Sequence, residues 1–197
     1  AILVEKGLLA DEQLDTFRKI DSKLQGHPNM NYVPGVDMST GSLGQGFAVA
    51  DGMALANRLN GNSHRVYCLI GDGESQEGEI WETAMSAAHY KNDHLCAIID
   101  VNGLQIDGRT SDVMNPNPLD EKFKAFGWHV IDVDGHDFKQ LRAAFKEASE
   151  TKGQPTAIIA KTIKGKGVSF MEDQAGWHGK APNLEQYEQA IQELEAQ

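Results

Sequence analysis

The chain has 197 residues, a formal net charge of −11 and a sequence pI near 5.0. Its length suffices for one domain whose core needs neither disulfides nor structural metals. The negative charge argues against broad binding to nucleic acids or anionic membranes. No apolar run approaches the ~18 residues of a membrane span. A phosphate ligand would therefore need a local holder, such as a metal ion or a helix N-terminus.

The two cysteines, Cys68 and Cys96, lie inside apolar stretches and form no CxxC pair. This pattern predicts buried thiols in the reducing cytoplasm. The first nine residues (AILVEKGLL) are typical of the end of a helix that stops at Gly7, so we expect native sequence before Ala1.

Four short apolar runs predict strands that are covered on both faces, because such strands are nearly continuously hydrophobic. These runs are Val66–Ile70, Leu95–Val101, His129–Val133 and Thr156–Lys161.

Helical patterns alternate with these runs, at Gln45–Leu59, Glu79–Tyr90, Leu119–Phe126, Asp137–Thr151 and Asn183–Ala196. Asp137 and Asn183 are suitable N-caps, and Gly153 is a stop signal. The helix that begins after Asp137 places Phe138, Leu141, Phe145 and Ala148 on one face.

Alternating strands and helices predict an α/β fold, a three-layer parallel sheet with helices on both faces. Without an internal repeat or a low-complexity linker, residues 1–197 are expected to form a single domain. Ligands of such sheets bind beyond the carboxyl ends of the strands. The informative residues are therefore expected at those ends.

The first strand ends in Gly71-Asp72-Gly73, and the second leads into Asn102. A carboxylate, an amide oxygen and a backbone carbonyl at one sheet edge suit a hard cation such as Mg²⁺. The two glycines allow close approach and a sharp turn. GDG is also a common turn tripeptide, but the 30-residue spacing to Asn102 matches one βαβ passage.

Residues 71–108, from GDGESQEG to NGLQIDG, resemble the thiamine diphosphate motif, and that of transketolases in particular. The resemblance implies the thiamine diphosphate-binding fold. It implies that Asp72, Asn102 and the backbone of Leu104 hold Mg²⁺, or Ca²⁺ or Mn²⁺ in its place. It also implies that Gly71 and Gly73 line the diphosphate site, with the Gly73 N–H contacting the diphosphate.

Three further segments are similar to transketolase motifs. MSTGSLGQG (38–46) implies that Gly41 and Leu43 line the aminopyrimidine pocket, although it could be only a glycine-rich helix start. QGHP (25–28) and WHGKAP (177–182) imply that His27 and His178 meet substrate hydroxyls and the cofactor, although an isolated histidine is often merely solvated. Lys161, Lys164 and Lys166 form a basic loop that contacts phosphate or is an ordinary solvated turn.

The function implied is transfer of a two-carbon ketol unit from a ketose phosphate to an aldose phosphate, in the cytoplasm. The cofactor supplies the carbanion chemistry, and the protein positions it. The activating glutamate of the family lies in a pyrimidine-binding domain that has no match here. We therefore expect the partner to be a C-terminal transketolase subunit, in a heterotetramer with a homodimer contact to which Glu77 contributes.

Two other histidine motifs of the family lie before the point where this chain starts, so an N-terminal portion is expected to be lacking. Two alternatives stay open. One is another thiamine diphosphate enzyme, such as 1-deoxyxylulose 5-phosphate synthase or a 2-oxoacid dehydrogenase E1 component, although QEG with NGLQIDG favours transketolase. The other is a catalytically silent module that binds only cofactor or partner.

Overall fold

The computed structural model describes residues 1–196 and divides the chain into two compact units, Ala1–Gly46 and Phe47–Gln197. The expectation that residues 1–197 form a single cofactor-binding domain stays a prediction. Within residues 1–196, no helix is both long and apolar enough to cross a membrane.

The first unit is built mainly of turns. It contains α1 (Ile2–Glu5) and the 3-10 helix η1 (Asp11–Thr16). Gly7 follows α1 with φ +69°, a left-handed conformation that glycine adopts without strain, and its N–H donates to the carbonyl of Val4. The helix that was expected to end near Gly7 is thus present.

The second unit contains a four-stranded parallel sheet in the order β1-β2-β6-β5. Its strands are β1 (Val66–Gly71), β2 (Leu95–Val101), β5 (His129–Asp134) and β6 (Thr156–Lys161). All three pairings are parallel. The predicted strands are confirmed, two of them with one residue added at the carboxyl end and two with the predicted bounds.

The predicted helices are also confirmed, with a shift of one residue at most ends. They are α2 (Gln45–Leu59), α3 (Gly78–His89), α5 (Leu119–Ala125), α6 (Phe138–Glu150) and α7 (Leu184–Glu195). Asp137 caps α6 by accepting from the N–H groups of Lys139 and Gln140, and Asn183 caps α7 through Gln186. Both caps agree with the sequence prediction.

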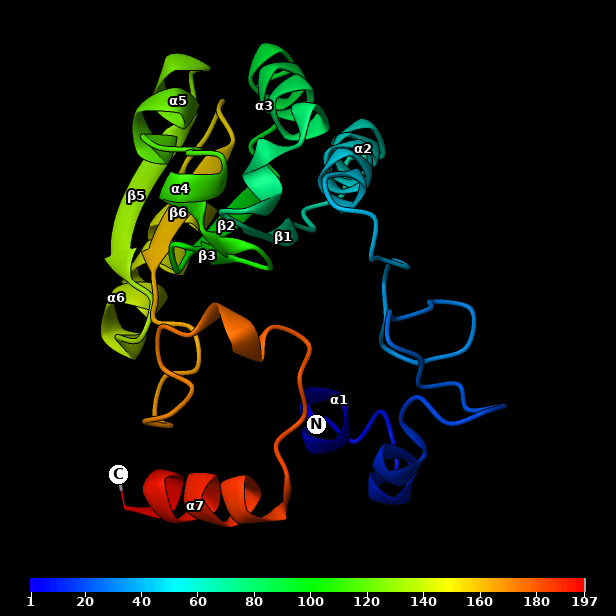
Figure 1. The fold of residues 1–197 in the computed structure, drawn as a ribbon. Helices are drawn as coiled ribbons and strands as arrows, with labels where there is room; N and C mark the ends of the chain where they lie inside the picture. The colour runs from blue at the N-terminus through cyan, green and yellow to red at the C-terminus, as the bar shows by residue number, and fades with distance from the viewer. Residues whose placement is uncertain (197) are drawn as a thin grey trace. The chain divides into compact units, whose positions relative to one another are not determined.

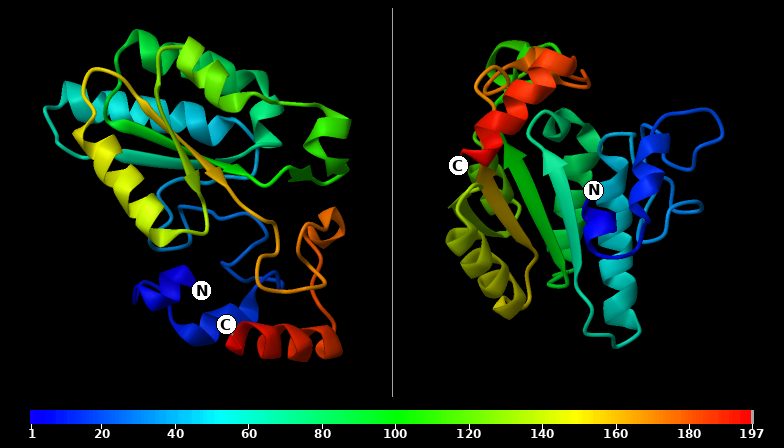
Figure 2. Two further views of the ribbon diagram at one scale, coloured as in Figure 1. Left: turned by 90° about the vertical axis from the view of Figure 1, so that its left-hand side faces the viewer. Right: turned by 90° about the horizontal axis from the view of Figure 1, so that it is seen from below.

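Helices cover both faces of the sheet, so the predicted three-layer architecture is confirmed. One core cluster joins α2, α3 and α5 to one face, around Phe47, Ile80 and Phe123. The second joins Ala144 and Ala148 of α6 to the other face, against Cys96 and Ile158. Figure 1 and the left view of Figure 2 show α6 on the opposite side of the sheet from α3 and α5.

The burial of β1 differs from the prediction. Tyr67 and Leu69 on this edge strand are 50% and 70% exposed, because the buried contacts of α6 lie on β2, β5 and β6 rather than on β1. The predicted apolar face of α6 is only partly buried. Ala148 is fully buried and Leu141 packs against the core, whereas Phe138 is exposed and Phe145 makes an edge contact with Tyr67.

Shorter elements surround the carboxyl ends of the strands. The 3-10 helix η2 (Glu74–Gln76) follows β1, and a small antiparallel pair, β3 (Leu104–Gln105) and β4 (Gly108–Arg109), follows β2. After this pair comes α4 (Thr110–Val113). A further 3-10 helix, η3 (Ala175–Trp177), precedes His178. These short elements are too brief for hydrophobic periodicity to indicate them.

Candidate functional site

The ends of β1 and β2 bring Asp72 and Asn102 together. Gly71 pairs with Asp100 in the parallel ladder, and the N–H of Asp72 donates to the Asp100 carbonyl at 3.0 Å. Both chain segments then leave the sheet at the same edge. This register confirms that the two strands are adjacent.

Asp72 is buried, with 1% of its surface exposed. One carboxylate oxygen accepts from the N–H of Gly73 at 2.9 Å, and the other from the N–H of Gly103 at 2.7 Å. Burial raises the pKa of this carboxyl, the two N–H groups oppose that effect, and the nearby Asp100 carboxylate adds to it. A buried carboxylate in this setting is suited to a cation, which would offset both its desolvation and its repulsion from Asp100.

Both the nitrogen and the oxygen of the Asn102 side-chain amide form hydrogen bonds. Its Nδ2 donates to Asp100 Oδ2 at 3.2 Å, and its Oδ1 accepts from the N–H of Leu104 at 3.0 Å. The other oxygen of Asp100 accepts from the hydroxyl of Thr162, the first residue after β6. The amide oxygen of Asn102 is thereby turned away from Asp100.

The segment after Asp72 is fixed against the β3–β4 pair. Ser75 donates its hydroxyl to the carbonyl of Asp72 at 2.5 Å, and Gln76 donates to the Gln105 side chain at 2.6 Å. A Cβ on Gly73 would lie 3.1 Å from the Cβ of Gln105, whereas one on Gly71 would have no neighbour closer than 3.9 Å. Close approach therefore constrains Gly73 more than Gly71. The N–H of Gly73 donates to Asp72, so its contact with a diphosphate stays a prediction.

His178 lies in the exposed segment that follows η3. Its Nδ1 is 3.5 Å from Lys164 Nζ. An exposed ion pair of 2.6 Å between Asp173 and Arg109 of β4 ties this segment to the β3–β4 pair. Trp177 anchors it further by donating its indole N–H to the Phe170 carbonyl at 2.9 Å.

The predicted basic loop is not one cluster of free cations. Lys161 lies 4.0 Å from Asp132, Lys166 lies 3.8 Å from Glu172, and Lys164 faces His178. Two of the three lysines are thus next to carboxylates. Lys164, in contrast, lies next to His178, which is a predicted site residue.

His27, Gly41 and Leu43 lie in the first unit. A Cβ on Gly41 would come within 2.7 Å of the His27 ring, and Gly41 has φ +138°, so the ring packs directly on this glycine. His27 and Leu43 are exposed. The structure therefore brings two of the three predicted residues together within this unit.

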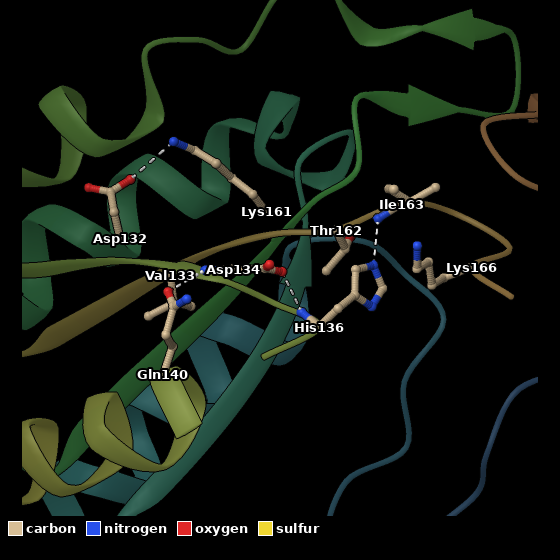
Figure 3. Close-up of a pocket in the computed structure, with 9 residues that line it drawn as sticks. All are labelled: Asp132, Val133, Asp134, His136, Gln140, Lys161, Thr162, Ile163 and Lys166. Atoms are coloured by element: carbon tan, nitrogen blue, oxygen red, sulfur yellow. Dashed lines mark hydrogen bonds and ion pairs between the residues drawn. The ribbon is translucent and has the colours of Figure 1, made fainter. Parts of the chain in front are cut away.

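A hollow of about 670 Å³ opens beside the carboxyl ends of β5 and β6. Figure 3 shows His136 in it, with its Nε2 accepting from the N–H of Ile163 at 2.8 Å. Asp134 accepts from the backbone N–H of His136 at 2.9 Å. His136 thus holds in place the segment that follows β6. Thr162 lines this hollow and also reaches Asp100.

Sequence reasoning missed Asp100 and Thr162. In residues 1–196, no group of three or more His, Cys, Asp or Glu side chains could hold a metal ion. A site made of one carboxylate, one amide and one carbonyl is not of that kind. The available signal was that Asp100 lies two residues before Asn102, at the end of the same apolar run.

Comparison with known proteins shows the family to which the chain belongs. Residues 6–195 match the family model "Transketolase, thiamine diphosphate binding domain". The chain is 44% identical to a 6-deoxy-6-sulfo-D-fructose transketolase subunit of Clostridium sp. (strain MSTE9), covering 99% of this chain and 71% of that protein. It is 42% identical to an apulose-4-phosphate transketolase subunit of Phocaeicola vulgatus, covering 98% of this chain and 68% of that protein.

Longer relatives match over a smaller share of their length. Human transketolase is 46% identical over all of this chain but only 31% of its own length. The crystal structure of the Campylobacter jejuni transketolase superposes with a TM-score of 0.86 at 35% identity, covering 93% of this chain and 30% of that one. The chain therefore belongs to the transketolase family, as the N-terminal, thiamine diphosphate-binding part of a transketolase-type transferase.

Proposed function

We propose that Asp72, Asn102 and the backbone carbonyl of Leu104 hold a divalent cation, Mg²⁺ with Ca²⁺ or Mn²⁺ as substitutes, that fixes the diphosphate of thiamine diphosphate. The observation that carries this proposal is the buried Asp72 carboxylate, held by two backbone N–H groups, one of them from the residue next to Asn102. Each carboxylate oxygen keeps acceptor capacity beyond its one N–H bond. Oxygen donors of these kinds are the ones that Mg²⁺ prefers, and substrate phosphates and water complete its shell.

The remaining residues are assigned from their places in the chain. Gly71 and Gly73 form the wall next to the diphosphate, and Gly41 and Leu43 the wall of the aminopyrimidine pocket. His27, packed on Gly41, and His178, beside Lys164, bind substrate hydroxyls and move protons there. His178 also neighbours the cofactor.

The activity proposed is transfer of a two-carbon ketol unit from a ketose phosphate to an aldose phosphate. Thiamine diphosphate, when bound, supplies the carbanion chemistry. The chain orients the cofactor through its cation and holds the donor sugar through the two histidines. We propose that residues 1–197 form a single cofactor-binding domain that works in the cytoplasm.

The partner proposed is a C-terminal, pyrimidine-binding transketolase subunit that brings the activating glutamate. The support is that two similar proteins are named transketolase subunits, while this chain spans 31% of human transketolase. Two copies of each chain would form a heterotetramer, with Glu77, exposed at the start of α3, at the contact between the copies.

A binding titration and a transfer assay test the proposal. Thiamine diphosphate binding is measured with Mg²⁺ and with EDTA, each with and without the pyrimidine-binding subunit. We expect Mg²⁺-dependent binding, and ketol transfer only with the partner. Absence of Mg²⁺-dependent binding even with the partner would contradict the proposal. Binding without transfer would indicate a catalytically silent module.

Asp72→Asn provides the residue-level test, because it preserves shape while it removes the charge. Loss of a residue that only orients a metal ligand typically weakens metal binding ~10–100-fold. We expect Asp72→Asn, which alters a ligand itself, to weaken Mg²⁺-dependent binding by at least as much. Asp112→Asn, at an exposed position of α4, is the matched control and should bind as the wild type does. Unchanged affinity in Asp72→Asn would show that another residue binds the cation.

A further inference from the structure

Asp100 has no place in the proposed set of cation ligands, yet both of its carboxylate oxygens have a hydrogen-bond donor. Oδ2 accepts from Asn102 Nδ2 at 3.2 Å, and Oδ1 accepts from the Thr162 hydroxyl. Asp100 lies near the carboxyl end of β2, and Asn102 is the first residue after the strand, so the two side chains meet where β2 leaves the sheet. Thr162 follows Lys161, which pairs with Val101, so the β2–β6 register places Thr162 next to them.

The orientation of the Asn102 amide decides what it offers a cation. Its oxygen is a metal ligand and its NH₂ group is not, and a 180° turn about the side chain exchanges the two. A carboxylate accepts hydrogen bonds only, so Asp100 pairs with the NH₂ group and disfavours the turned orientation. The N–H of Leu104 selects the same orientation from the other side, because it donates to Oδ1.

Asp100 itself is held in place by Thr162. The hydroxyl of Thr162 donates to Oδ1, and its backbone N–H donates to the carbonyl of Val101 at 3.1 Å. Without this hydroxyl, the Asp100 carboxylate could rotate and release the Asn102 NH₂ group. Three side chains at the carboxyl ends of two adjacent strands, β2 and β6, thus form one relay from Thr162 through Asp100 to Asn102.

We propose that Asp100, held by Thr162, is a positioning residue that keeps the Asn102 amide oxygen directed at the cation of the thiamine diphosphate site. This inference rests on the proposed function, in which Asn102 is a cation ligand. Outer partners of this kind typically contribute about 10–100-fold to metal affinity. The relay also explains why a carboxylate stays next to Asp72 although its charge opposes that of Asp72.

The test uses a matched pair of variants at Thr162 that leaves every charge unchanged. Thr162→Val removes the hydroxyl and keeps the shape, whereas Thr162→Ser keeps the hydroxyl. In the intact protein assembled with its pyrimidine-binding subunit, the Mg²⁺ concentration for half-maximal thiamine diphosphate binding is measured by equilibrium dialysis. We expect Thr162→Val to raise it about 10-fold and Thr162→Ser to stay near the wild type.

Asp100→Asn completes a double-mutant cycle with Thr162→Val. Alone, Asp100→Asn should raise the Mg²⁺ concentration for half-maximal binding by about 10–100-fold. The double variant should show the same value as Asp100→Asn, because Thr162 acts through Asp100. The denaturation midpoint without cation is recorded for each variant, and if Asp100→Asn does not fold, the Thr162 pair alone decides.

Each outcome has one meaning. A wild type without Mg²⁺-dependent binding overturns the proposed function. If the wild type binds and Thr162→Val needs the same Mg²⁺ concentration for half-maximal binding, this inference is overturned. Any effect of Asp100→Asn would then come from its change of charge alone. Additive effects in the double variant would likewise overturn the relay. Rescue by serine together with non-additivity supports it.

Discussion

At the scale of single residues, Gly73 is constrained by space rather than by backbone conformation. Its φ is −62°, which any residue adopts, but an added Cβ would lie 3.1 Å from Gln105. The hydrogen bond of Gln105 to Gln76 limits how far Gln105 can move away. A side chain at position 73 would therefore press the β3–β4 pair away from Asp72.

We predict that Gly73→Ala destabilises the fold by about 1–3 kcal/mol, the usual cost of overpacking, and weakens Mg²⁺-dependent cofactor binding. Gly78→Ala is the matched control, because Gly78 begins α3 and an added Cβ there meets nothing within 4 Å. It should be neutral or stabilise by up to about 1 kcal/mol. Urea denaturation compares the two. Equal stability of both variants would show that Gln105 gives way without cost.

The sequence allowed Asp72 and Asn102 to be placed at one edge, because each directly follows a recognisable apolar strand. Asp100 and Thr162 could not be connected in the same way. Their contact depends on β2 lying next to β6, and the order β1-β2-β6-β5 is not sequential. Strand order is set by packing over the whole sheet, which local patterns do not encode.

At the scale of elements, strand positions were predictable and their coverage was not. An apolar run predicts a strand but does not reveal which helix covers which face, so the exposure of Tyr67 and Leu69 on β1 was missed. The same holds for α6, whose buried contacts come from Ala144 and Ala148, while Phe138 is exposed. Small side chains let this helix approach the sheet closely.

The Glu193 carboxylate links α7 to the segment after β6. Glu193 accepts from the N–H of Ser169 at 2.5 Å and from its hydroxyl at 2.7 Å, while Gln189 donates to it from within the helix. These bonds, the Ser169 N–H first, lower the pKa of Glu193 below its usual 4.5. A lowered pKa in the fold means that the contribution of Glu193 to stability is present above pH 4.5 and is lost as the pH falls through the lower, folded value.

We predict that a nuclear magnetic resonance titration of the Ser169 amide shows a transition below pH 4.5 in the wild type. Glu193→Gln should abolish this transition and speed proteolysis between Ser169 and α7 at neutral pH. Glu188→Gln is the control, because Glu188 is exposed on the same helix and makes no side-chain bond within the described part of the chain. A wild-type transition at or above pH 4.5 would contradict the assignment.

At the scale of the whole molecule, the proposed cation couples cofactor binding to folding. A ligand that binds only the folded state stabilises it by about 2.7 kcal/mol at 100 times its Kd. For a chain of 197 residues, this corresponds to a rise in Tm of about 5–10 °C. Because Asp72 is buried and anchored by backbone groups, the unfolded chain offers no comparable site. The rise should therefore require both Mg²⁺ and thiamine diphosphate.

We predict that EDTA removes this rise in Tm at constant thiamine diphosphate, and that Asp72→Asn shows a smaller rise than the wild type at the same Mg²⁺ and thiamine diphosphate concentrations. Both are measured by calorimetry on the complex with the pyrimidine-binding partner, at fixed protein concentration, because partner binding itself shifts Tm. A full rise in EDTA would show that the diphosphate is held without a cation. A rise in Asp72→Asn that equals the wild type would place the cation elsewhere. If Mg²⁺ alone produces the whole rise, the site is preformed for the metal, and the diphosphate adds no coupling of its own.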